Sequence, residues 1–365
     1  MPPDAGRESL RARLFAPKLT GAVLAVAIAL AVSFVAILVS GKNAPLGFAY
    51  LFEGAVGGWG PIGESAVKGS VLVLTGLSVA IPFTVGLFNI GAEGQLIWGA
   101  LAAAVAGRAF DLPAPILVPL CLAAAALAGG LWGALPGALK ALRGVHEVIS
   151  TILLNWVAIH LVHGWLVAGP LAAPGSGSAI SMAGTAPIQL AAHLFRPFRG
   201  SRLDLGLPLS LAIAWGVWFL LTRTWRGFEW RATGAGAEAA RASGIGTRRC
   251  VVEAMALAGA IAGVAGALLV LGTEHRFPGV FRTGYGFDGI AVALIGGATA
   301  PGTALAGLFF GALRAGSTRL QLVGIHPSFA DLIQGTAVLL VAMPRAFSPL
   351  LVRLRARVVP PTPPP

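Results

Sequence analysis

The chain has 365 residues, of which 56% are apolar and only 11% are charged, and its mean hydropathy is +0.82. Soluble domains carry roughly 25% charged residues, so this composition excludes a water-soluble body and predicts an integral membrane protein in contact with lipid. The net charge of +12 does not indicate nucleic-acid binding, because the basic residues stand mainly between hydrophobic runs and near the two ends, where they set membrane topology.

Ten apolar or glycine-rich segments follow one another along the chain, and a membrane-spanning helix needs about 20 mostly apolar residues. They are residues 20–40, 67–86, 93–109, 114–139, 149–169, 206–222, 251–272, 286–299, 302–318 and 328–344. The third, eighth and ninth are short, so the expected count is nine or ten. The first segment is too long for a signal peptide and lacks a small-residue cleavage site, which favours an uncleaved helix. The predicted fold is an all-α, polytopic membrane helix bundle.

The distribution of Lys and Arg predicts that both ends of the chain are cytoplasmic, because basic residues gather on the inner side of a membrane. The resulting regions are an inner tail over 1–19, a transmembrane region over 20–344 with an outer loop over 170–205 and an inner loop over 223–250, and a proline-rich inner tail over 345–365. The exception is the outer loop, which holds Arg196, Arg199 and Arg202. We interpret these arginines as a contact for an acidic partner outside the membrane.

Three clusters of polar residues interrupt the apolar runs, and each needs a reason, because a charge at the centre of a membrane helix costs about 2.5–3.5 kcal/mol. The first is LFNIGAEGQLIWGA over 87–100, which holds Asn89, Glu93 and Gln95 beside two glycines. If this segment is helical, Asn89 and Glu93 share a face and Gln95 does not. The glycines favour a break, which would expose backbone groups to a solute in a protein-lined cavity. Hydrogen bonding between helices is the alternative interpretation.

The second cluster is GVHEVISTILLNW over 144–156, in which Glu147, Thr151 and Asn155 recur every four residues. This spacing places them on one helix face, as expected either for a helix that lines a pathway or for a buried helix contact. His160 and His163 follow, but no third ligand at a suitable spacing accompanies them, so we predict no metal site.

The third cluster is GYGFDGIAVALIGGATAPGTALAG over 284–307. Asp288 is its most costly residue, and we interpret it either as a functional group or as the partner of a helix end or a basic residue. Gly296, Gly297 and Pro301 predict a short helix, a turn and another short helix. A weak echo relates GYGFDGIA to GLFNIGA over 86–92 and would match Asp288 to Asn89.

The inner loop contains a compact, alanine-rich helical pattern that predicts a docking helix. It comprises Ala237, Glu238, Ala239, Ala240, Arg241 and Ala242, and Gly244 is expected to stop it. Small side chains allow a close fit into a groove of a partner, whereas a simple connector would not require a well-terminated helix.

Nucleotide hydrolysis is excluded for this chain by its lysines. A phosphate-binding loop requires GxxxxGK followed by Ser or Thr. Lys18, Lys42, Lys68 and Lys140 are followed by Leu, Asn, Gly and Ala. We therefore predict no catalytic residues and no bound cofactor. Cys121 and Cys250 are expected to be reduced thiols without a chemical role.

Four motifs, in this order along the chain, resemble the ABC permease family of branched-chain amino acid, ribose and nucleoside importers, and most closely its nucleoside and simple-sugar branch. They are GLFNIGAEGQ (86–95), EVISTILLN (147–155), RATGAGAEAARASGI (231–245) and YGFDGIAVALIGG (285–297). The resemblance implies a type II importer-like permease in a bacterial plasma membrane. The family's larger residue and proline are replaced here by Ala235, Gly236 and Ala237, which puts the tightness of the docking contact in doubt.

The resemblance also implies partners. A separate ABC ATPase would use ATP-Mg and dock on residues 238–244, a second identical or related permease subunit would pair with this chain, and an extracytoplasmic lipoprotein would deliver a nucleoside or simple sugar. The polar residues of the three clusters would line the path. The alternative from a different class is a stand-alone secondary transporter or channel that uses Glu93 and Asp288 as proton or cation sites.

Overall fold

The computed structural model describes residues 5–174, 184–198, 200–279, 281 and 284–342. Arg199 and the predicted tail over 345–365 lie outside this range. Within it, the regular elements are all helical, as predicted. They are α1 (Ala5–Val39), α2 (Ala44–Val56), α3 (Trp59–Phe83), α4 (Ala92–Ala109), α5 (Ala114–Arg143), α6 (Glu147–Ile159), η1 (His160–Val167), η2 (Leu190–Ala192), α7 (Gly206–Arg223), α8 (Trp225–Ala235), α9 (Ala237–Ala242), α10 (Thr247–Leu269), η3 (Val270–Glu274), α11 (Tyr285–Ile295), α12 (Ala300–Ser317), η4 (Thr318–Val323) and α13 (Phe329–Ala342).

Every one of the ten predicted segments coincides with a helix of the described chain. Among the residues that the structure describes, six helical stretches are long and apolar enough to cross a membrane: Gly21–Val39, Trp59–Phe83, Ala114–Arg143, Glu147–Val167, Gly206–Arg223 and Thr247–Glu274. Two of them continue into π-helical turns, η1 and η3, at their C-terminal ends. The predicted turn between two short helices is confirmed, because α11 ends at Ile295 and α12 begins at Ala300.

Residues 5–19 of the predicted inner tail are helical and continue α1. Two helices, α2 and α8, are not among the predicted segments. The first is only 13 residues long and begins where the Asn43 side chain accepts a hydrogen bond from the Leu46 N–H, with proline in its first turn. The second is rich in Arg and Gly and has no apolar run to mark it.

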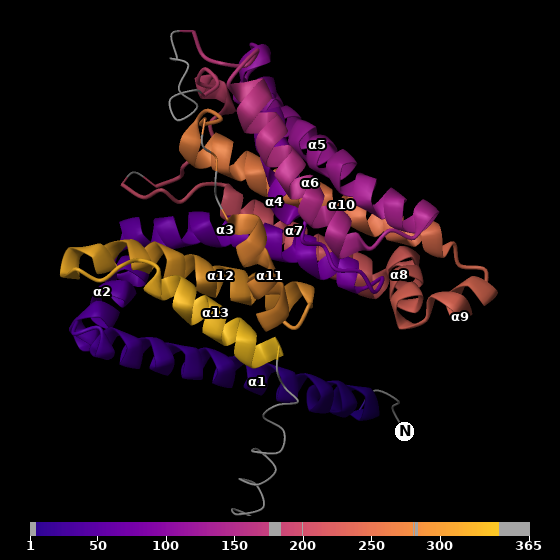
Figure 1. Cartoon of the computed structure of the whole chain (residues 1–365), viewed down its shortest axis with the longest axis horizontal. Coiled ribbons are helices and arrows are strands. Elements are labelled where there is room, and N and C mark those ends of the chain that lie inside the picture. Colours follow the sequence, from indigo (N-terminus) through magenta and orange to yellow (C-terminus); the bar gives the residue numbers. More distant parts are fainter. Residues whose placement is uncertain (1–4, 175–183, 199, 280, 282–283, 343–365) are drawn as a thin grey trace, which may run out of the picture.

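The helices α5 and α10 lie side by side in close backbone contact (Figure 1). Gly129 and Gly133 on α5 face Gly259 and Gly263 on α10, so a Cβ atom added to Gly133 would lie 2.9 Å from the Cα of Gly259. Small residues of this kind are what allow two helix backbones to meet inside a membrane.

Two groups of three helices in the bundle are packed in a similar way. The long helix α3 lies against α12 and α11, and the long helix α10 lies against α5 and α4. Each long helix is followed by an irregular segment and then by a second helix, α4 or α11. The first of these irregular segments, residues 84–91, holds Asn89, one of the predicted pathway residues.

Candidate functional site

The first polar cluster lies at a break between α3 and α4. Residues 84–91 are not helical, because the backbone turns after Phe83 and helix resumes only at Ala92. Asn89 is fully buried within this segment, and its Nδ2 donates to the Gln95 Oε1 at 3.0 Å while its Oδ1 accepts from the Gly91 N–H at 2.9 Å. The expected break is thus present, and Asn89 pairs with Gln95 instead of sharing a helix face with Glu93.

Asn155 on α6 joins that helix to the same break. Its Oδ1 accepts from the Gly94 N–H at 2.8 Å, and its Nδ2 donates to the Ile90 carbonyl at 2.7 Å. Irregular backbone at membrane depth is tolerated only when its polar groups find partners in the protein. One amide side chain therefore satisfies a donor and an acceptor that the interrupted helix leaves open.

Glu93 connects the start of α4 to the start of α11. Its carboxylate, which is 3% exposed, accepts from the backbone N–H of Gly284 at 3.0 Å and from that of Gly286 at 2.7 Å. The N-terminal N–H groups of a helix have no partner within the helix and carry a partial positive charge, so a carboxylate there is stabilised. One carboxylate thus links the first turn of α4 to the first turn of α11.

The remaining members of the second cluster lie on one face of α6, as predicted, but they have local partners. The Thr151 hydroxyl donates to the Glu147 carbonyl at 2.8 Å, one turn earlier in the same helix. The Glu147 carboxylate lies 2.8 Å from the Lys140 ammonium near the end of α5. We define the polar junction as the set Asn89, Glu93, Gln95 and Asn155. Glu147 and Thr151 lie closer than Asn155 to the N-terminal end of α6.

Asp288 lies on α11 and belongs to a separate group. Its carboxylate accepts from Arg314 on α12 and from the Gln334 Nε2 on α13, the second at 2.9 Å. The Arg314 guanidinium also lies 4.1 Å from the centre of the Tyr285 ring. The interpretation of Asp288 as the partner of a basic residue is therefore the one that its geometry matches.

Sequence analysis missed Arg314 and Gln334 as members of this group. A signal was available for Arg314, because an arginine inside an apolar segment predicts an acidic or carbonyl partner nearby. No signal in the sequence indicated that Asp288 would be its partner, since 26 residues and a turn separate the two.

The short helix predicted in the inner loop is present as α9, which ends as expected before Gly244, a residue in the left-handed conformation at φ 83°. Ala237, Glu238, Ala239 and Arg241 are exposed and Ala240 is buried. In Figure 1, α8 and α9 project together at the end of the bundle where α1 begins. The chain therefore presents a short, exposed helix at one membrane face.

The arginines of the outer loop are partly used inside the protein. Arg196 donates to the Gly272 carbonyl and lies beside the stacked rings of His193 and His275, whose centres are 3.8 Å apart. Arg202 lies 3.2 Å from the Glu64 carboxylate and keeps most of its side chain exposed. Burial, together with the nearby charges of His193 and Arg196, lowers the pKa of His275 to about 4.

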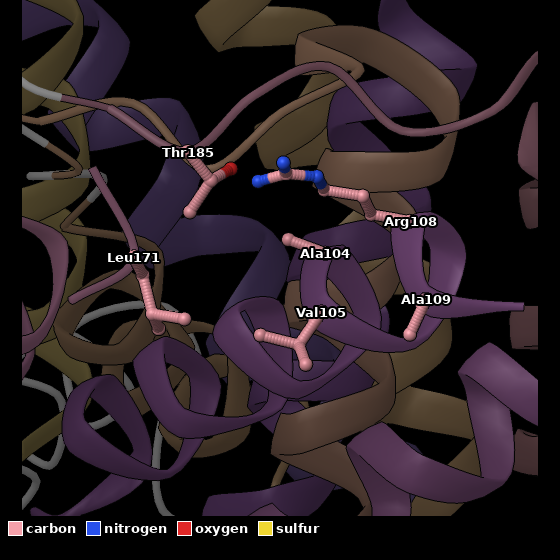
Figure 2. A pocket seen from close by; sticks show the side chains of 6 residues that line it. All are labelled: Ala104, Val105, Arg108, Ala109, Leu171 and Thr185. Carbon is pink, nitrogen blue, oxygen red and sulfur yellow. The ribbon is translucent and has the colours of Figure 1, made fainter. Parts of the chain in front are cut away.

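A pocket of about 240 Å³ lies near the outer end of α4, away from the polar junction (Figure 2). Its walls are apolar apart from two residues, Arg108 and Thr185, which point toward one another across its rim. None of the predicted pathway residues lines it. Within the described residues there is also no group of three or more His, Cys, Asp or Glu side chains that would hold a metal ion.

Comparison with known proteins gives one family. The sequence profile described as the permease component of the branched-chain amino acid transport system matches residues 61–343. A guanosine ABC transporter permease protein of Bacillus subtilis is 38% identical over 343 residues, which cover 92% of this chain and 96% of that protein. No solved structure gives a significant match.

Two further relatives carry different solutes in their names. A glucose ABC transporter permease protein of Haloferax volcanii is 33% identical, with 87% of this chain and 85% of that protein covered. A nucleoside ABC transporter permease protein of Lactococcus lactis is 29% identical, with 87% and 89% covered. These three proteins share nearly the full length of the chain, and two of them are named for nucleosides.

Proposed function

Because this chain belongs to the family of branched-chain amino acid transport permease components, the membrane subunits of ABC importers, we propose that it carries a nucleoside across the membrane. The relatives named for guanosine and nucleosides support this solute, and a simple sugar is the second choice because one relative is named for glucose. Uptake of labelled guanosine by cells that carry or lack the chain is the first test. Competition by excess uridine, but not by glucose, is the expected result; competition by glucose alone would replace the nucleoside with a sugar.

The observation that carries the subunit role is the exposed helix α9. We propose it as the docking site for a separate ATPase that uses ATP-Mg. Its exposed side chains, at one end of the bundle, are two small ones and two of opposite charge: Ala237, Ala239, Glu238 and Arg241. The chain has no phosphate-binding loop of its own, so the energy must come from another polypeptide.

Purification of the tagged chain from native membranes, followed by identification of the co-purifying proteins, tests this docking site. An ABC ATPase is expected with the wild-type chain and is expected to be lost with Ala239→Trp, since the larger side chain would obstruct a close fit. Ala114→Trp is the matched control, because Ala114 is also exposed and begins α5 at the opposite end of the bundle. Loss of the ATPase from both variants, or from neither, would remove α9 as the docking site.

Further partners and the placement of the chain are part of the same proposal. We place it in a bacterial plasma membrane with both termini cytoplasmic, paired with a second permease subunit and supplied by an extracytoplasmic lipoprotein. The basic residues of the inner loop, Arg223, Arg226, Arg231, Arg241, Arg248 and Arg249, support this orientation.

The predicted pathway residues have a more specific role in this proposal. Asn89, Glu93, Gln95 and Asn155 are at most 3% exposed and are engaged with each other or with backbone groups. We propose that they shape the wall of the path by holding the helix break in place, with Glu147, Thr151 and Asp288 bracing the adjoining helices. The hypothesis of a stand-alone carrier that uses Glu93 and Asp288 has no support from the relatives, which are named as ABC permeases.

A further inference from the structure

We propose that Gly234, at the C-terminal end of α8, is the contact through which movement of the docked helix α9 reaches the polar junction. This inference rests on the proposed ATPase docking. Gly234 is a positioning residue in this proposal, and its role follows from the close approach between the inner loop and the break at 84–91.

The first step is the connection of α9 to α8. The two helices are separated by Gly236 alone, whose backbone is extended, and they pack against one another. Every α9 side chain except Ala240 is exposed, so the bundle itself holds α9 weakly. A load applied to α9 by a docked partner is therefore transmitted mainly through α8.

The second step is the attachment of α8 to the bundle. Trp230 is 4% exposed within the core, and the Arg226 guanidinium lies 3.1 Å from Glu229 on α8 and 3.8 Å from Glu253 on α10. Gly227 lies against the backbone at the end of α7, where an added Cβ would be 2.6 Å from the Leu221 carbonyl oxygen. These contacts make α8 a stiff element with one end at α7.

The third step is the contact made by the other end of α8. A Cβ atom added to Gly234 would lie 2.9 Å from the Thr84 carbonyl carbon and 3.1 Å from the Gly86 nitrogen, and it would overlap the Thr84 oxygen. Gly86 is itself in the left-handed region at φ 78°, a conformation that glycine adopts without strain. The backbone of α8 therefore rests directly on the backbone of the break.

The fourth step leads from the break to three transmembrane helices. Three residues after Gly86, Asn89 holds Gln95; Asn155 of α6 binds Ile90 and Gly94; and Glu93 holds the start of α11. A displacement of the Thr84–Gly86 segment therefore moves hydrogen-bonded neighbours on α4, α6 and α11 together. Side-chain contacts elsewhere would absorb part of such a load, whereas a backbone-to-backbone contact does not.

The test compares Gly234→Ala with Gly316→Ala in the assembled importer, reconstituted in vesicles with its ATPase and binding protein. An added Cβ at either glycine would meet a backbone carbonyl group of another element, but Gly316 lies on α12 and faces Leu51 of α2, whereas Gly234 faces the break. ATP hydrolysis and solute uptake are measured on the same vesicles, together with the amount of ATPase bound. Changes along a coupling route typically alter coupling by about 0.5–2 kcal/mol, so we expect Gly234→Ala to lower the solute carried per ATP by about twofold to thirtyfold.

The expected pattern is normal ATPase binding in both variants and a reduced uptake-to-hydrolysis ratio in Gly234→Ala only. An unchanged ratio in Gly234→Ala, or an equal reduction in both variants, would overturn the inference. Where Gly234→Ala fails to assemble, Gly86→Ala strains the left-handed backbone at the segment that Gly234 touches and is expected to lower the ratio similarly. An unchanged ratio in that variant would also overturn the inference. Absence of the ATPase from the wild-type preparation would instead refute the proposed docking itself.

Discussion

The Glu93 carboxylate on α4 accepts a hydrogen bond of 2.7 Å from the backbone N–H of Gly286 on α11, across 193 positions of sequence. Glycine is the only residue type that fits at position 286, because an added Cβ atom would overlap the backbone of Ala92 and Glu93. The two helices that follow the irregular segments are thus held end to end by one acid.

Glu93→Gln is expected to destabilise the protein, because a neutral amide accepts from the two N–H groups more weakly and brings a buried donor without a partner. The expected loss is about 1–3 kcal/mol. A lower midpoint of thermal aggregation of the purified chain in detergent checks it. Glu238→Gln on the exposed helix α9 is the control and should leave the midpoint unchanged. A midpoint for Glu93→Gln equal to that of the wild type would contradict the prediction.

Asn155→Leu removes both links between α6 and the break, leaving the Gly94 N–H and the Ile90 carbonyl without partners. Each such group costs about 1–3 kcal/mol when buried. We expect reduced amounts of folded protein and reduced uptake, with an unchanged KM for the solute in the protein that remains. A raised KM at normal folded yield would show instead that Asn155 binds the solute.

Asp288→Asn breaks the ion pair with Arg314 while retaining an acceptor for Gln334. Removing one partner of a fully buried pair costs about 3–5 kcal/mol, and this pair is partly exposed, so a smaller loss is expected. Combining it with Arg314→Gln should restore part of the stability in a double-mutant cycle. Additive losses in that cycle would show that the two side chains do not interact energetically.

The acid stability of the outer loop should depend on His275. Its pKa falls from the ordinary 6.5 to about 4 in the folded protein, so between these values the unfolded chain binds the proton more readily than the folded one. Its contribution to stability is therefore complete above about pH 6.5 and is lost as pH falls toward 4. The thermal midpoint of the wild type should drop over this range.

His275→Asn is the variant for that measurement, because His275 has a left-handed backbone at φ 55°, which asparagine tolerates. Its thermal midpoint should fall less between pH 7 and pH 5 than that of the wild type. Equal slopes for the two proteins would show that another group is responsible.

Arg202→Glu tests the interpretation of the outer arginines as a contact for an acidic partner. The Arg202 side chain is mostly exposed, although its guanidinium forms an ion pair with Glu64. Reversal of the charge should slow uptake at low salt, and the difference should shrink above about 0.15 M salt, where the Debye length is about 8 Å. Equal uptake by both proteins at low salt would remove this contact.

The sequence predicted the long helices well because apolar length alone identifies them, and it predicted the breaks because glycine and proline stand at them. It failed at α2, although Asn43 and Pro45 mark a helix start, because 13 residues are too few for a spanning segment. It failed at α8 because Arg and Gly suggest a loop until Trp230 is seen to be buried.

The polar residues could be identified from sequence but not interpreted. The position of Asn89 and Glu93 between apolar runs was sufficient to show that their side chains need hydrogen-bonding partners. Apart from the Gln95 side chain, the partners described above are backbone groups, which leave no trace in the sequence. Whether Glu93 faces a solute or the N–H groups of Gly284 and Gly286 is decided only by how α11 folds back on α4.

The contact between α5 and α10 also has a consequence at the level of the gene. Any change in the first or second base of a glycine codon encodes a larger residue or a stop. At Gly129, Gly133, Gly259 and Gly263 the added atoms would meet the backbone of the opposite helix. Every single-base change that alters the amino acid at these four codons therefore disturbs the contact between the two helices. A screen of all substitutions for uptake should recover no replacement at these four glycines, whereas Leu127 and Leu131, which are exposed on α5, should accept many. The codons of the four glycines between α5 and α10 are then expected to accumulate substitutions more slowly than the rest of the gene.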